Sequence, residues 1–277
     1  MNRNQMIKCI FDGDRDKMRD YICRTGKKKI YQYRRFNNYA VENITDGNIV
    51  LSNPLDFNDP YDLYYTLDWN ELMFTSNRVE RFRRKQALKN KVIQEECNRI
   101  LQETREDIEK IIIQEKQDVF ISCFSTVPTS ILMWGHYADC HRGYCAEYNV
   151  EDILSLCEEK NIIFFDVDYS KEMVKIGVSG DKKQQFISAF FVKYIDWQYE
   201  HEWRLFKIDV NKLDVEECAN SDYGKIIYKG IKPSRIILGT NMLEQNKEKI
   251  KNICQENNIG LAYAYKDLYE YKLNIRE

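Results

Sequence analysis

The chain has 277 residues, of which 43% are hydrophobic, so it is long enough for one large domain with a core of ordinary size. Its 42 basic and 44 acidic residues leave a net charge of −2, which excludes a global attraction to nucleic acid or to an anionic membrane. Nine cysteines without a short repeating spacing are not typical of a secreted disulfide framework, and no apolar run approaches about 18 residues. We therefore expect a single cytoplasmic domain, residues 1–277, with no membrane partner.

The first elements are a charged helix that ends near Cys23 and an aromatic strand over 29–36 (KIYQYRRF). Alternation along that strand predicts two faces, with Tyr31, Tyr33 and Arg35 on one and Gln32 and Arg34 on the other.

A second strand over 48–52 leads into the loop 56–62 (DFNDPYD), which supplies Asn58 and Asp59 as candidate binding residues. Asx side chains also bond their own backbone in turns, so turn chemistry alone would explain this loop.

Residues 75–116 carry apolar side chains at near-helical intervals among dense charge, without Pro or Gly. The pattern predicts a helical insertion, either one long helix or a helical pair. We favour a solvated hairpin, and a dimer-forming element or a lid stays open as the alternative.

After the insertion, 118–124 is typical of a buried strand, and a helix capped by Thr129 or Ser130 is predicted to run to about Arg142. Spacings of four residues would place Met133, Tyr137 and His141 on one face of this helix and His136 and Cys140 on another.

The rest of the chain mixes strands and helices without a regular βαβ rhythm, which favours an α+β fold. We expect a mixed, mostly antiparallel split sheet with flanking helices. Further strands are predicted at 144–149, 162–169, 203–210, 226–228, 235–238 and 261–265, and further helices near 182–194 and 243–257.

Two short segments, 130–145 and 194–206, contain all three histidines and three of the four tryptophans. Histidine transfers protons near neutral pH, and titratable groups gather at functional sites. We favour a functional site over a structural cluster of aromatic side chains.

The segment 199–204 (YEHEWR) gives the most specific indication of a reaction. If it enters a strand, Glu200, Glu202 and Arg204 project from one face, with neighbours about 6.5–7 Å apart. Fixed carboxylates stabilise the positive charge that develops on a sugar ring when a glycosidic bond breaks. The alternative is a surface ladder of salt bridges, which would contribute little.

The sequence gives weaker support for two other kinds of site, a zinc site and a cysteine nucleophile. His136, Cys140, His141 and Cys145 have the ligand types for zinc, but a spacing of five prevents the two histidines from facing one ion on a helix. Cys123 or Cys145 could act as a nucleophile, yet no local protease signature accompanies either.

Five segments in order, YQYRRF, LSNPLDFNDPYD, ISCFS, MWGHYADCHRGYCAEY and WQYEHEWR, resemble the bacterial and phage family known as domain of unknown function 2971. The resemblance covers about 30–239. It departs from the family at two positions, where Gln32 replaces the usual Lys and Asp62 the usual Glu, so any family role of these positions is in doubt.

More distantly, the chain resembles ADP-ribosyltransferases, which place an Arg or His, a Ser-rich strand and a late Glu in this order. The resemblance implies that Arg34 holds NAD phosphate or ribose, that Ser125 braces the nicotinamide pocket, and that Tyr31 or Tyr137 stacks on it. It further implies that Glu202 stabilises the oxocarbenium ion and Glu200 orients or deprotonates the acceptor. We add as candidates the remaining site residues: His136 and His141 as catalytic groups outside that template, and Arg35, Asn58, Asp59, Trp134 and Arg204 as binding groups.

On this interpretation the protein is an NAD-dependent transferase, a toxin or antiphage effector, with NAD as co-substrate, no metal and an unknown acceptor. Two alternatives stay open: a nucleic-acid-binding module that stacks bases on the aromatic clusters, and a metal-assisted hydrolase built on Asp59, Asp62 and the histidines.

Overall fold

The structure is a computed structural model that describes residues 3–68, 102, 106–107, 109–177, 182–208 and 224–277. Most of the predicted insertion at 75–116 lies outside the described residues. Its described end, 109–117, is helical, as the sequence pattern indicates. None of the described helices is long and apolar enough to cross a membrane.

The N-terminal part begins with two helices and continues as short strands around a third helix. Asp14 starts the second helix by accepting a hydrogen bond from the backbone N–H of Lys17. The elements are α1 (Arg3–Phe11), α2 (Arg15–Arg24), β1 (Lys29–Arg34), α3 (Asn38–Thr45), β2 (Ile49–Ser52), η1 (Pro54–Asp56) and β3 (Tyr65–Leu67).

The middle of the chain contributes four of the described strands of the main sheet and several of the elements that surround the site. They are β4 (Val119–Ser125), α7 (Ile131–Tyr137), β5 (Tyr144–Asn149), α8 (Val150–Lys160), β6 (Ile163–Asp166), β7 (Asp168–Ser170), β8 (Val174–Ile176), α9 (Lys182–Ala189), β9 (Val192–Tyr194), η2 (Ile195–Glu200) and β10 (Glu202–Ile208).

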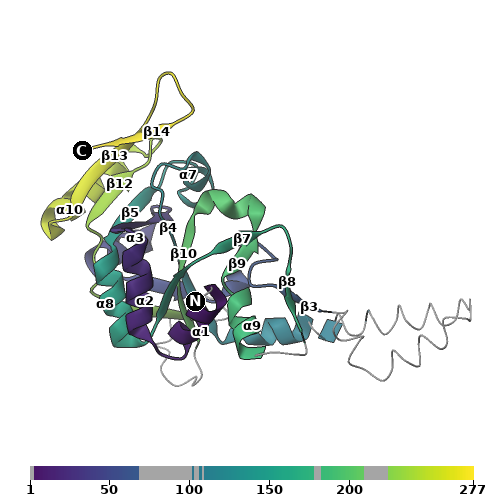
Figure 1. The fold of residues 1–277 in the computed structure, drawn as a ribbon. Coiled ribbons are helices and arrows are strands. Elements are labelled where there is room, and N and C mark those ends of the chain that lie inside the picture. Colours follow the sequence, from purple (N-terminus) through teal and green to yellow (C-terminus); the bar gives the residue numbers. More distant parts are fainter. Residues whose placement is uncertain (1–2, 69–101, 103–105, 108, 178–181, 209–223) are drawn as a thin grey trace, which may run out of the picture.

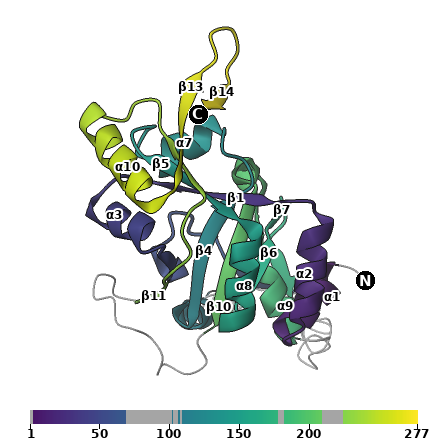
Figure 2. The same ribbon diagram turned by 90° about the vertical axis from the view of Figure 1, so that its left-hand side faces the viewer.

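The C-terminal part adds one helix and the last strands, and its final hairpin projects from the body of the molecule (Figures 1 and 2). The elements are β11 (Lys225–Tyr228), β12 (Arg235–Leu238), α10 (Glu244–Asn257), β13 (Gly260–Lys266) and β14 (Leu273–Arg276).

Within the described residues the main sheet runs β11-β2-β4-β1-β5-β12-β13-β14, and β10 joins it by pairing with β4 and β6. The β12–β13 pair is parallel, whereas the other pairs of this sheet are antiparallel. The predicted α+β class with a mixed, mostly antiparallel sheet is confirmed.

The sheet splits at β4. This strand pairs with β10 along its whole length, yet it meets β1 only at Ser125 and β2 only at Ile121 in the described register. Between these two points, residues 122–124 of β4 have no described strand partner on that side, so the strands diverge there. Side chains instead of a neighbouring strand face this opening.

Helices cover the faces of the sheet through apolar side chains. Helices α2 and α8 lie side by side (Figure 1), and Arg19 of α2 bonds to Glu151 and Glu158 of α8. Beneath them Met18, Ile22 and other buried side chains form the main core with β6 and β10. Burial of such side chains is the principal stabilising term for the fold.

The helix predicted up to Arg142 is shorter than expected, because α7 ends at Tyr137. Asp139, Cys140 and His141 then have φ values of 50°, 53° and 66°, so the chain makes a left-handed turn in their place. The predicted face Met133–Tyr137–His141 and the pair His136–Cys140 are wrong, since His141 and Cys140 are not on the helix.

Candidate functional site

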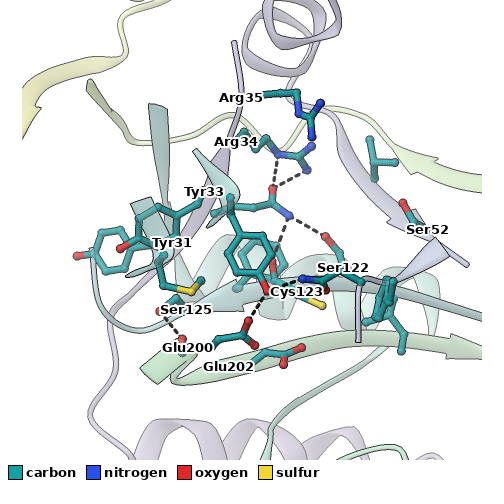
Figure 3. Close-up of a pocket in the computed structure, with 18 of the residues that line it drawn as sticks. Tyr31, Tyr33, Arg34, Arg35, Ser52, Ser122, Cys123, Ser125, Glu200 and Glu202 are labelled. Carbon is teal, nitrogen blue, oxygen red and sulfur yellow. Dashed lines mark hydrogen bonds between the residues drawn. The ribbon is translucent and has the colours of Figure 1, made fainter. Parts of the chain in front are cut away.

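A pocket of about 570 Å³ occupies the split in the sheet, a size that is usual for small-molecule sites. Its walls come from β1, β2, β4, α3, α7 and β10 and from the end of η2. In Figure 3, Arg34 and Arg35 lie at one end of the pocket and Glu200 and Glu202 at the other.

Gln32 bridges the two diverging strands. Its amide nitrogen donates to Ser122 Oγ at 2.9 Å and to the carbonyl oxygen of Cys123 at 3.3 Å. Its amide oxygen accepts from Nε and Nη2 of Arg34 at 2.9 and 2.7 Å (Figure 3). The amide thus replaces the missing backbone hydrogen bonds and fixes the guanidinium.

Among the described residues, no carboxylate neutralises the cationic end of the pocket. Arg34 is oriented by a neutral amide, and within the described part of the chain no carboxylate pairs with Arg34 or Arg35. Lys225 of β11 lines the same pocket. Guanidinium groups without a carboxylate partner are suited to phosphate, which they bind through two parallel N–H donors.

At the other end, one ammonium holds two carboxylates. Lys193 Nζ of β9 donates to Glu200 Oε2 and, at 3.1 Å, to Glu202 Oε2. The same Nζ lies 3.6 Å from Asp62 Oδ2. All four side chains are buried.

Arg204 lies beneath this cluster and is fully buried, with 0% of its surface exposed. Its guanidinium donates to both carboxylate oxygens of Asp62, to both of Glu202 and to the carbonyl oxygen of Phe190. Since every one of these bonds is internal, Arg204 supports the site and is not itself part of the pocket wall. The alternative of a surface salt-bridge ladder is wrong, because these charged side chains are buried.

The two glutamates reach the pocket from different elements. Glu202 opens β10, but Glu200 ends η2, and His201 between them has a left-handed φ of 45°. The prediction that Glu200, Glu202 and Arg204 share one strand face is therefore correct only for Glu202 and Arg204. The turn at His201 brings Glu200 back to the same ammonium.

The environments of the two glutamates differ. Burial raises the pKa of Glu200, and the attraction of Lys193 does not cancel this effect. Burial also opposes ionisation of Glu202, but Arg204 and Lys193 outweigh it and hold the pKa of that carboxyl well below its usual range. Two carboxyl groups with pKa values pushed apart are the usual arrangement for one proton-transfer group and one permanent anion.

Tyr137 and Ser125 fix Glu200 from two sides. The Tyr137 hydroxyl donates to Glu200 Oε1 at 2.5 Å and accepts a long bond of 3.5 Å from Asn58. Ser125 Oγ donates to the Glu200 carbonyl oxygen at 2.6 Å. Burial raises the pKa of Tyr137, so its hydroxyl keeps the proton.

The structure thus brings together eight of the candidate residues in one pocket: Tyr31, Arg34, Arg35, Asn58, Ser125, Tyr137, Glu200 and Glu202. The others lie outside its lining. Trp134 is fully buried against Tyr33 and donates to the carbonyl of Pro128, and Asp59 lines a separate, smaller hollow.

The two candidate catalytic histidines are also outside the pocket. His136 is exposed beside Tyr199, and His141 stacks on Trp134 with ring centroids 6.3 Å apart. The turn that carries His141 is held by close packing, because a Cβ on Gly143 would lie 2.2 Å from the carbonyl oxygen of Arg34. This turn positions β1 and contributes no group to the pocket.

Sequence reasoning missed Lys193 and the bridging role of Gln32. A signal for Lys193 existed: it is a lone cation within the apolar run 189–195 (AFFVKYI), where an unpaired charge would be costly. Gln32 gave no comparable signal, since its role depends on where β1 and β4 separate.

The geometry of the described residues argues against each of the alternative chemistries. No group of three or more His, Cys, Asp or Glu side chains in the described ranges is arranged to hold a metal ion. Burial raises the pKa values of the Cys123 and Cys145 thiols, which opposes a nucleophilic role. Trp134 and Trp203 are buried, so they are not free to stack on bases.

Fold and site together define a mostly antiparallel α+β protein with a charged pocket at a split in its sheet. The model of one family, described as "Protein of unknown function (DUF2971)", matches residues 133–205. This stretch contains the part of α7 from Met133 onward, Lys193 and the segment with both pocket glutamates. No curated protein and no solved structure matches the chain, and the more distant resemblance to ADP-ribosyltransferases receives no support from these comparisons.

Proposed function

We propose that the pocket binds NAD and cleaves the bond between nicotinamide and ribose, passing the ADP-ribosyl group to an acceptor. One observation carries this proposal: the pocket has at one end guanidinium groups that no carboxylate of the described residues pairs with, and at the other a carboxylate pair. NAD has the complementary polarity, with an anionic diphosphate and a cationic nicotinamide ring.

The cationic end suits the diphosphate. Arg34 is held in one orientation by Gln32, so little conformational entropy is lost when it binds. Arg35 and Lys225 add positive charge in the same pocket. Tyr31 lines the wall between the two ends and offers a flat face for stacking.

The carboxylate end suits the bond-breaking step. As the C1′–N bond breaks, its electron pair goes to the nicotinamide nitrogen, and positive charge develops on the ribose. The permanently ionised Glu202 stabilises that charge. The acceptor oxygen or nitrogen then bonds to C1′ and gives its proton to Glu200, whose raised pKa suits a general base.

With an essential macromolecule as acceptor, such a reaction would make the protein a toxin or an antiphage effector, because ADP-ribosylation would stop the function of that macromolecule. The acceptor would enter beside Glu200, where Tyr137 of α7 also reaches the pocket. The acceptor is a macromolecule or a small molecule of unassigned class.

The test is release of nicotinamide from NAD by the purified protein, alone and with host cell extract. We expect release by the wild type and a loss of about 100-fold or more in Glu200→Gln and Glu202→Gln. Glu172→Gln, at an exposed position, serves as the matched control. If the wild type releases no nicotinamide in either condition and NAD does not shift its melting temperature, the proposal is wrong.

A further inference from the structure

The charge count of the buried cluster is unusual. Three carboxylates, Asp62, Glu200 and Glu202, meet two cations, Lys193 and Arg204, within hydrogen-bonding or ion-pair distance. If every group is ionised, the cluster carries one excess negative charge. A buried excess charge is costly, so the cluster favours either one bound proton or a cationic ligand.

The two cations do not have equivalent positions. Arg204 contacts Asp62 and Glu202, whereas within the described residues the ion-pair partner of Glu200 is Lys193. Lys193 also lines the pocket, and Arg204 does not. The ammonium of Lys193 is therefore the group that couples both pocket glutamates to each other.

Contacts from several elements hold Lys193 in this position. Its side chain is only 6% exposed, and its Nζ lies 5.0 Å from the centre of the Trp197 ring. Among the described residues, the charged or titratable groups around it are Asp62, Cys123, Tyr137, Tyr169, Tyr199, Glu200, Glu202 and Arg204. Further out, Lys116 faces Asp62 and Asp59.

We propose that Lys193 is the positioning residue of this site: its buried ammonium holds Glu200 and Glu202 together and favours the ionised form of Glu200, which can accept a proton. The assignment of Glu200 as the base of a transfer reaction rests on the proposed function. The effect of Lys193 on the protonation of Glu200 is a property of the folded protein alone.

The directions of the shifts agree with this role. Burial opposes the charged form of Lys193, but Glu202, Asp62 and Glu200 outweigh it and raise its pKa, so the ammonium persists. Lys193 lowers the pKa of Glu200 against the effect of burial. Without the ammonium, burial and the negative charge of Glu202 would raise the pKa of Glu200 further, opposed by the hydrogen bond from Tyr137.

The test uses Lys193→Gln, which removes the charge but keeps a donor for both glutamates, beside Lys193→Arg, which keeps the charge. In Lys193→Gln we expect the limb of the pH–rate profile for nicotinamide release that requires ionised Glu200 to move up by about one to three pH units. Lys193→Arg should leave the limb in place even if its kcat falls. A merely structural lysine would lower the melting temperature of Lys193→Gln without moving the limb.

A second readout needs no catalysis. The Glu200 carboxyl is titrated by ¹³C NMR in protein labelled at glutamate, and its signal is assigned by its loss in Glu200→Gln. A higher midpoint in Lys193→Gln than in the wild type supports the inference even if no nicotinamide is released, in which case only the proposed function fails. An unchanged midpoint in a folded Lys193→Gln overturns the inference, whether or not the wild type cleaves NAD.

Discussion

Arg204 and Asp62 are 142 residues apart in the chain, yet Nη2 of Arg204 donates to both carboxylate oxygens of Asp62, at 2.8 and 2.9 Å. This contact joins the loop that follows β2 to the strand that carries Glu202. The carboxylate end of the pocket is thus built on a buried ion network that spans the fold.

Removing the charge of Arg204 should destabilise the protein strongly. Arg204→Met leaves Asp62 and Glu202 buried without their main partner, and loss of one member of a buried pair costs about 3–5 kcal/mol. Urea unfolding measures the change. Arg142→Met, at an exposed arginine that pairs with Asp139, should leave the free energy of unfolding nearly unchanged. Equal stability of the two variants would refute the structural role of Arg204.

Gly143→Ala should alter the pocket, although Gly143 does not line it. The new Cβ would lie 2.2 Å from the carbonyl oxygen of Arg34, so β1 or the turn must move, at a cost of about 1–3 kcal/mol. Gly135→Ala in α7 is the matched control, because nothing lies within 4 Å of the Cβ it adds. We expect a lower melting temperature and weaker NAD binding in Gly143→Ala but not in Gly135→Ala.

Glu202 should make the protein sensitive to acid. Its pKa is depressed in the folded state, so its contribution to stability is present above its unfolded value of about 4.3 and is lost as the pH falls through the folded value. Glu200 acts in the opposite sense, because its raised pKa favours folding at low pH, and this contribution is lost as the pH rises through the folded value.

Urea unfolding between neutral pH and pH 3 checks the Glu202 prediction. Glu202→Gln should lose stability less steeply with falling pH than the wild type does, although it starts from a lower value. Glu172→Gln should retain the wild-type slope. Parallel slopes in the wild type and Glu202→Gln would contradict the ionisation that we assign to Glu202.

Gln32→Glu should weaken anion binding. The substitution places a carboxylate where a neutral amide now contacts Arg34, so the guanidinium would be neutralised internally. We expect at least about a tenfold loss of affinity for ADP-ribose, or roughly 1.4 kcal/mol, by calorimetry. Gln198→Glu, at an exposed position on η2, should bind as the wild type does.

Much of the fold could be predicted from local patterns. Alternation predicts the strand at 29–36, of which 29–34 form β1, and an apolar run predicts the buried strand β4. Capping chemistry predicts a helix start at Thr129 or Ser130, and Ser130 is the cap. The end of α7 could not be predicted this way. It depends on the close approach of Gly143 to β1, which is a contact between distant parts of the chain.

The sequence predicts which segments contribute to the pocket better than it predicts which of their side chains line it. Clustering of titratable and aromatic residues pointed to Glu200, Glu202 and Tyr137, which the pocket contains. The same clustering pointed to Trp134 and His141, which pack against each other instead. Residue type alone does not separate a ring that lines a cavity from one that fills the core.

The most direct measurement of the central claim is calorimetric titration of NAD into Glu200→Gln, which should bind the dinucleotide without consuming it. If the two charged ends of the pocket form one NAD site, each chain binds one NAD, and adding Arg34→Gln weakens that binding by at least about tenfold. Absence of saturable binding to Glu200→Gln and to the wild type, with both proteins folded, would contradict the account.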